Sequence, residues 1–117
     1  MNLEVAVNKH VDWKAKLRLA ISKKETLDAT TIAKDDCCDL GKWLYGEGKL
    51  KFGQLTSYSD CVAKHKAFHS NAGRVATAIN AKKYEEAMAM IGMNIPYADA
   101  STVAIGAILK LKKEASL

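Results

Sequence analysis

Histidines are the residues of this 117-residue chain whose spacing points most directly to chemistry. His65 and His69 are four positions apart, and in a helix this spacing puts both imidazoles on one face, about one turn apart. Two such rings can reach one ion at the ~2.0–2.1 Å that zinc takes from nitrogen. His10 adds a third imidazole from a separate part of the chain. Together the three rings predict a metal site.

A cysteine would complete a tetrahedral set of three nitrogens and one sulfur. Periodicity favours Cys37, which shares a helical face with two leucines. Cys38 lies instead near Gly41, where a missing side chain would leave room for bulky imidazoles. Cys61, one turn before His65, is a third candidate, although packing within a helix is the commoner role for such a residue. The residues alone leave this choice open.

The competing interpretation is that the histidines are ordinary hydrogen-bonded core residues. A lone inward histidine usually is one. Three of them in a small core are harder to satisfy, because each ring brings two nitrogens that need partners. A metal accepts one nitrogen of each ring, and a carbonyl or carboxylate takes the other. The pattern therefore favours a metal site over core packing.

Helical periodicity defines the elements that would carry these residues. Apolar residues recur with that period from Leu3 to about Lys23, and His10 lies in the same stripe. The polar stretch 24–34 is expected to be a connection. Asp35 or Asp36 then predicts the N-cap of a short helix that ends at Tyr45, before Gly46.

The second half of the chain predicts three more helices. They span about 54–79, with His65 and His69 facing inward, 83–91, and 96–113, and the glycines at 46–53 mark a loop before them. The last helix is apolar nearly all round at 103–109, so we expect a homodimer. The predicted fold is all-α: a single domain over 1–117, a four-helix bundle with an additional short helix and the zinc site in its core.

Composition limits the classes of function. Apolar residues make up 49% and charged residues 26%, as in globular domains. No signal peptide opens the sequence, and the longest uncharged apolar run, 100–109, is half of the ~20 residues that span a bilayer. We therefore expect a cytoplasmic protein with reduced thiols and no membrane insertion. The net charge of +5 comes from scattered lysines without interleaved aromatics, so no nucleic-acid partner is expected.

Three motifs, in order, resemble one known family. The segments 10–13, 38–43 and 65–69 read HVDW, CDLGKW and HKAFH. They are similar to the HxxW, CxLGxW and HxxFH signature of the bacterial chemoreceptor zinc-binding (CZB) domain. The resemblance covers roughly Ala6 to the C-terminus, and it decides between the cysteines. It implies that the zinc ligands are His10, Cys38, His65 and His69.

The neighbouring motif residues acquire expected roles from the same resemblance. Trp13 and Trp43 are expected either to wall the site with apolar surface or to pack in the core. Gly41 is expected to permit close approach of helices, and Phe68 to pack between the two histidines of its own helix. Roles for Cys37 and Cys61 do not follow from the family.

Chemistry at such a site is expected to be regulatory. Four protein ligands leave no open position for water, and no glutamate adjoins the histidines as in HExxH proteases, so we expect no enzyme. The resemblance implies a sensory domain of bacterial signal transduction, dimeric and linked to a chemoreceptor or diguanylate cyclase in the same or another chain. It would sense zinc or oxidants such as hypochlorous acid. The alternative is a constitutive structural zinc domain for homodimerisation.

Overall fold

The computed structural model describes residues 1–92 and 96–117. Helices dominate, and no strand occurs among the described residues, so the all-α prediction is confirmed. The helices are α1 (Leu3–Val11), α2 (Trp13–Lys23), α3 (Ala29–Ile32), α4 (Asp39–Tyr45), α5 (Glu47–Phe52), α6 (Thr56–Asn80), α7 (Tyr84–Met90) and α8 (Pro96–Glu114).

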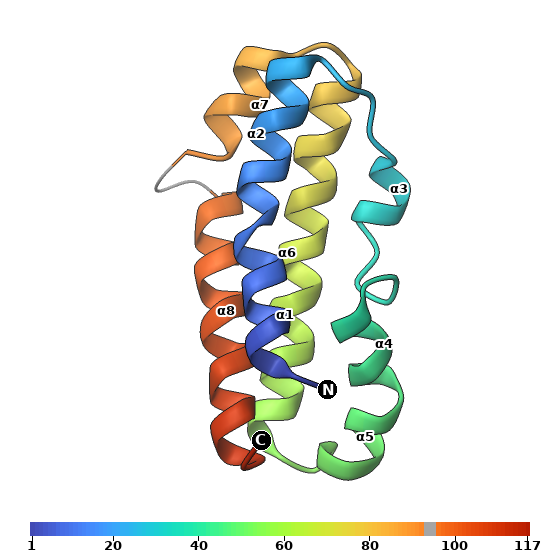
Figure 1. Cartoon of the computed structure of the whole chain (residues 1–117), viewed down its shortest axis with the longest axis vertical. Helices are drawn as coiled ribbons and strands as arrows, with labels where there is room; N and C mark the ends of the chain where they lie inside the picture. Colours follow the sequence, from blue (N-terminus) through green and yellow to red (C-terminus); the bar gives the residue numbers. More distant parts are fainter. Residues whose placement is uncertain (93–95) are drawn as a thin grey trace.

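Long helices form one side of the molecule, which we call the long-helix frame: α1, α2, α6 and α8. The first two follow each other as one column, because Asp12 between them keeps helical angles (φ −68°, ψ −17°). The most extensive packing in the protein is between α6 and α8. The frame gives the molecule its elongated shape of 43 × 25 × 19 Å (Figure 1).

Residues 24–55 form the other side, which we call the short-helix segment. It runs along the frame as α3, α4 and α5, joined by turns (Figure 1). The prediction of irregular chain at 24–34 and 46–53 is wrong in part. Asp28 caps α3 by accepting from the Thr31 amide, and Gly48 lets α5 lie against the Trp43 ring, where an added Cβ would be 2.9 Å from a ring carbon. Both short helices depend on these specific contacts rather than on periodicity.

The start of α4 also differs from the prediction. Its N-cap is Cys38, whose sulfur accepts from the Gly41 amide at 3.3 Å, and not Asp35 or Asp36. The Asp35 carboxylate instead accepts from the Tyr45 hydroxyl. A cysteine sulfur can occupy the capping position because the unpaired amides of a helix's first turn donate to any suitably placed lone pair.

The remaining helices agree with the periodicity. The predicted helices at 54–79, 83–91 and 96–113 appear as α6, α7 and α8 with ends shifted by at most two residues. No helix in the described part of the chain has both the length and the apolar character that crossing a bilayer requires.

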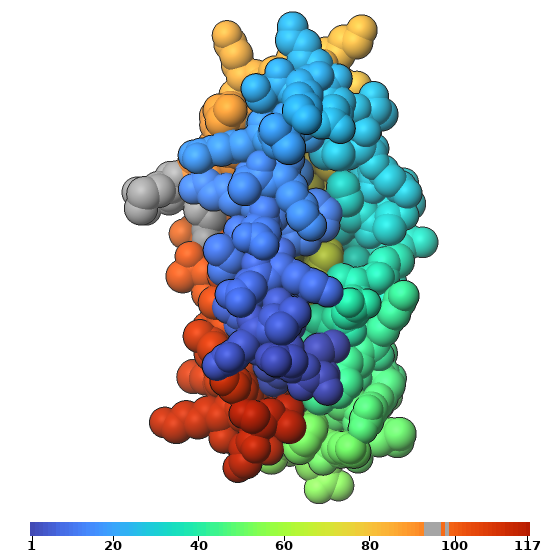
Figure 2. Space-filling model, in the orientation of Figure 1, coloured from blue at the N-terminus to red at the C-terminus, as the bar shows by residue number. Residues whose placement is uncertain are grey.

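Two apolar clusters make up the core formed by the described residues. One includes Leu3, Leu44 and Cys61, and the other includes Leu17, Phe68 and Val75. Along α1 and α2, His10 comes between residues of the first cluster and residues of the second. Along α6, His65 lies at the boundary between the two clusters, and His69 lies one turn further, among the first residues of the second cluster. The space-filling view shows the N-terminal helices and the short-helix segment meeting along a lengthwise seam over this region (Figure 2). The polar site is therefore enclosed at both ends by apolar packing.

Candidate metal centre

Four side chains from three elements converge between the two apolar clusters. His10 comes from α1, His65 and His69 come from α6, and Cys38 caps α4. One donor atom from each residue lies within 4.8 Å of every other. The His65 Nε2 is 3.1 Å from the His10 Nε2, 3.0 Å from the His69 Nε2 and 3.3 Å from the Cys38 Sγ. The Cys38 Sγ is 3.5 Å from the His69 Nε2.

Backbone carbonyls fix two of the three rings. The Nδ1 of His10 is 2.7 Å from the Ala6 carbonyl oxygen, and the Nδ1 of His69 is 2.9 Å from that of Ile32. A carbonyl only accepts, so each Nδ1 must carry the proton. In the neutral rings both Nε2 atoms therefore present a lone pair to the centre of the cluster, which is the tautomer that a metal requires.

Burial keeps all three rings neutral. His10, His65 and His69 are 3%, 0% and 2% exposed. Removal from water lowers the pKa of each imidazole. For His65, burial and, to a smaller extent, the neighbouring rings of His69 and His10 together lower the pKa to about 3. For His10 and His69, the hydrogen bonds to Ala6 and Ile32 oppose this lowering. Neutral imidazole is the form that binds a metal.

Burial has the opposite effect on the cysteine, because its charged form is the thiolate. Desolvation raises the pKa of the half-buried Cys38 thiol, while the amide of Gly41 acts against this rise. A divalent cation beside the sulfur would deprotonate it. The sulfur at the first turn of α4 is thus placed where a thiolate has one amide donor and the positive end of a helix.

The donor set fits a tetrahedral zinc ion. Ligand atoms ~2.0–2.3 Å from a tetrahedral zinc are roughly 3.3–3.6 Å apart, close to the separations in this cluster. The hydrogen-bonding pattern is also incomplete without a cation. Neutral His65 has one proton, which can reach only one of the two lone pairs facing it from His10 and His69. The Nδ1 of His65 is buried and has no partner among the described residues.

The other two cysteines lie outside the cluster. Cys37 is exposed, and its sulfur is 3.6 Å from a carboxylate oxygen of Asp36. Cys61 is fully buried in the apolar cluster of Leu3 and Leu44, and burial raises its pKa to about 12. Cys37, the choice that periodicity favoured, lies outside the cluster because residues 35–38 are not helical and so do not follow a helical face.

Some of the expected supporting roles need correction. Trp43 takes the core-packing alternative and packs toward Phe52 of α5, with ring centroids 6.0 Å apart. Trp13 lines the same cavity as His10 and Cys38. Phe68 does not separate His65 from His69; its ring contacts His69 at 5.3 Å and His10 at 5.2 Å.

Gly41 allows a close approach, but not one between helices or toward the imidazoles. A Cβ at this position would collide with the backbone carbonyl of Asp35. Its amide also donates to the Cys38 sulfur, so the glycine holds the turn 35–38 against the first turn of α4.

The carbonyl partners are functional groups that the sequence reasoning missed. Ala6 is four residues before His10 on the same helix, so helix geometry could have identified it. Ile32 could not be found this way, because it belongs to α3, thirty-seven positions from His69. Its placement depends on Gly73, where an added Cβ would lie 2.5 Å from the Cβ of Ala33.

Comparison with known families now bears on this geometry. The family model described as "Chemoreceptor zinc-binding domain" matches residues 10–76, which is more than half of the chain. The chain belongs to the chemoreceptor zinc-binding domain family. The matched range contains all four converging residues and all three motifs. No match was found among curated proteins or among solved structures.

Membership confirms the family resemblance and zinc as the cofactor. The CZB family consists of regulatory zinc-binding domains of chemoreceptors and other signalling proteins, and such a domain is not catalytic by itself. The cluster in the core of this CZB domain is consistent with a zinc site.

Proposed function

We propose that His10, Cys38, His65 and His69 bind one Zn²⁺ and that this CZB domain is a cytoplasmic sensory module. The observation that carries the proposal is the convergence of three imidazole Nε2 atoms and one sulfur within 4.8 Å of one another. Two of the nitrogens are committed to the metal-binding tautomer by their carbonyl partners. A zinc ion would satisfy both lone pairs at once and would hold Cys38 as a thiolate.

Metal content tests the ligand set directly. We expect about one zinc per chain in the wild type by elemental mass spectrometry, and strongly reduced zinc in Cys38→Ser and His69→Ala. Cys37→Ser is the matched control, since it removes the adjacent exposed thiol and should retain zinc. Zinc loss in Cys37→Ser with retention in Cys38→Ser would overturn the assignment.

Sensing is supported by the unequal attachment of the four residues. The three histidines lie on the long-helix frame, whereas Cys38 lies on the short-helix segment. Oxidation of Cys38 to the sulfenic acid would weaken the one sulfur ligand and release α4 from the frame. With hypochlorous acid, the thiolate sulfur attacks chlorine and hydroxide leaves; water then displaces chloride from the sulfenyl chloride. The same release would follow loss of zinc.

A constitutive structural role remains the second candidate, because all three histidines are buried and four protein ligands leave no position open for a substrate. Oxidant treatment separates the two functions. A sensor should lose zinc in step with sulfenic acid formation at Cys38, measured by dimedone labelling and mass spectrometry. A structural site should keep zinc and an unmodified Cys38 at oxidant levels that modify Cys37.

A second copy of the chain and a signalling domain are the proposed partners. Val103 and Leu109 are 45% and 47% exposed on α8, and Gly106 between them has open space within 4 Å of an added Cβ. This face supports a homodimer through α8. The output would pass to a chemoreceptor or diguanylate cyclase domain, in the same chain or another. Sedimentation of Val103→Glu beside the wild type tests the dimer, and a monomeric wild type would contradict it.

A further inference from the structure

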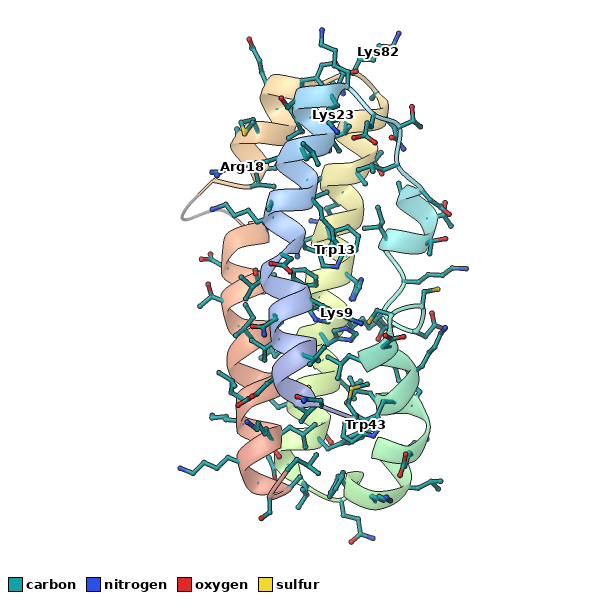
Figure 3. All side chains as sticks on the ribbon, viewed as in Figure 1. Lys9, Trp13, Arg18, Lys23, Trp43 and Lys82 are labelled. Carbon is teal, nitrogen blue, oxygen red and sulfur yellow. The ribbon has the colours of Figure 1, made fainter. Side chains whose placement is uncertain are left out.

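A groove of about 490 Å³ lies between the N-terminal helices and residues 37–40. Its walls include Lys9, His10, Trp13 and Lys16 on one side and Cys38 and Asp39 on the other. Figure 3 places Lys9 and Trp13 on the side of α1 and α2 that faces the short-helix segment, whereas Arg18 points away. The groove therefore follows the seam between the two sides of the molecule.

Two members of the cluster, His10 and Cys38, line this groove, whereas His65 and His69 do not, and Cys38 is the more exposed of the two. The three histidines are at most 3% exposed, whereas Cys38 is half-buried. A small molecule entering from solvent would meet the Cys38 sulfur before it met the imidazoles of α6. The groove therefore leads from solvent to a nucleophile, the Cys38 sulfur.

The charged groups at the mouth have an excess of positive charge. The Lys9 ammonium is 3.0 Å from the Asp39 carboxylate, and this pair joins α1 to α4 across the groove. Lys16 is exposed, and its ammonium is 5.2 Å from the centre of the Trp13 ring, with no carboxylate paired to it among the described residues. Among the side chains that line the groove, two cations and one anion give a net charge of +1 beside the thiol. Such a groove concentrates small anions.

We propose that this groove is the route by which small anionic electrophiles reach the Cys38 sulfur, attracted by Lys9 and Lys16 and opposed by Asp39. The inference deepens the proposed function, since Cys38 is one of the proposed zinc ligands. The reactant class is a small molecule that carries a carboxylate, sulfonate or other oxyanion beside an atom that a thiolate can attack. Asp39 then has two effects. It joins α4 to Lys9 of α1 across the groove, and its negative charge weakens the preference for anionic reactants.

Two alkylating reagents of nearly equal size and different charge test the route. Iodoacetate is an anion and iodoacetamide is neutral. In each case the Cys38 sulfur forms a bond to the methylene carbon, the carbon–iodine bond breaks and iodide leaves. Rates are measured by mass spectrometry in a Cys37→Ser background, because the adjacent exposed thiol would otherwise report in the same peptide. Each rate is divided by that of glutathione with the same reagent.

The ratio of the iodoacetate rate to the iodoacetamide rate is the readout, because changes in the thiol pKa affect both reagents alike. We expect Lys16→Gln and Lys9→Gln each to lower the ratio about twofold to fivefold at low ionic strength. Asp39→Asn, which removes the negative charge and keeps nearly the same size, should raise the ratio by a similar factor. Lys110→Gln on α8 is the matched control and should leave it unchanged. Added salt should reduce all these differences.

A steric variant tests the path independently of charge. Val5 lines the groove and is 46% exposed, so Val5→Trp would fill it without altering a buried position. This variant should slow both reagents several-fold and leave their ratio unchanged. Unaltered rates in Val5→Trp, ratios that do not respond to the charge variants, or a Cys38 that neither reagent modifies would overturn the route.

Failure of the route and failure of the proposed function give different results. The rates are measured on the zinc-loaded chain and on the chain after chelator treatment, with circular dichroism confirming that both are folded. A chain that binds no zinc yet responds to the charge variants would overturn the zinc assignment alone. A chain that binds zinc with unresponsive ratios would overturn the route alone.

Discussion

The long-helix frame and the short-helix segment are stabilised in different ways. The frame buries large apolar side chains such as Leu17, Phe68 and Ile108 along continuous helices. The short-helix segment contributes few fully buried side chains, chiefly Leu40 and Leu44, and is fixed by specific contacts such as those of Gly41 and Gly73. Three proposed ligands belong to the first side and one to the second. A metal site that joins two such sides can change the position of the weaker one without dissolving the stronger one.

The largest difference is expected for matched phenylalanines. Phe68 is fully buried in the frame, and Phe68→Ala should lower the free energy of unfolding by about 3–5 kcal/mol. Phe52 is half-buried in the short-helix segment, and Phe52→Ala should cost roughly 1 kcal/mol. Urea denaturation of the metal-free chain measures both. Equal costs would show that the two sides are equally well packed.

Lowering the pH should destabilise the protein through the long-helix frame, because the frame carries all three histidines. Burial lowers the pKa of His65 from 6.5 to about 3 in the folded chain, so the unfolded chain gains a proton first as the pH falls. The stability that neutral His65 contributes is complete above pH 6.5 and is lost progressively below it. Between pH 7 and pH 5 the metal-free chain should lose roughly 2 kcal/mol from this residue alone.

The control for this pH dependence is His65→Leu, which removes the titrating ring and keeps an apolar side chain at a buried site. Its stability should vary less between pH 7 and pH 5 than that of the wild type. A wild-type stability that rises on acidification would contradict the pKa direction.

Glycine substitutions test the joint between the two sides. Gly73→Ala would place its Cβ 2.5 Å from the Cβ of Ala33 and push α3 away from α6, at a cost of about 1–2 kcal/mol. Gly106→Ala on α8 meets nothing within 4 Å in a single protomer and, at concentrations where the chain is monomeric, should stabilise it by about 0.5–1 kcal/mol. Thermal unfolding compares the two variants. Ala33→Gly in the Gly73→Ala background should recover part of the loss.

The smallest expected effect concerns the start of the short-helix segment. The side chain of Asn80 bonds both backbone groups of Leu27, at 2.8 Å and 2.7 Å, near the end of the long helix α6. Asn80→Ala should cost about 1 kcal/mol and should speed amide exchange at Leu27. Because the bonds are exposed, exchange within the centre of α6 should not change. Asn71→Ala, which loses only a bond within α6, is the control.

What the sequence could predict follows the same division. The frame was predictable, because His65, His69 and the apolar stripe of α6 obey one period over many turns. The short-helix segment was predictable only in part: the helix that ends at Tyr45 was expected, and α4 ends there. The Asp28 cap, the Gly48–Trp43 contact and the Cys38 cap were not, since they are single contacts without a period. The convergence on Cys38 rather than Cys37 came from the family motif. The position of the Ile32 carbonyl required the fold itself.

Hydrogen exchange with and without zinc tests most directly whether the metal site holds the short-helix segment against the frame. Chelation should speed exchange in residues 28–45 at least tenfold, while the centres of α6 and α8 change much less. Cys38→Ser should reproduce this pattern, and Cys37→Ser should not. A uniform change across the chain, or unaltered exchange in residues 28–45 after zinc has been removed, would contradict this coupling.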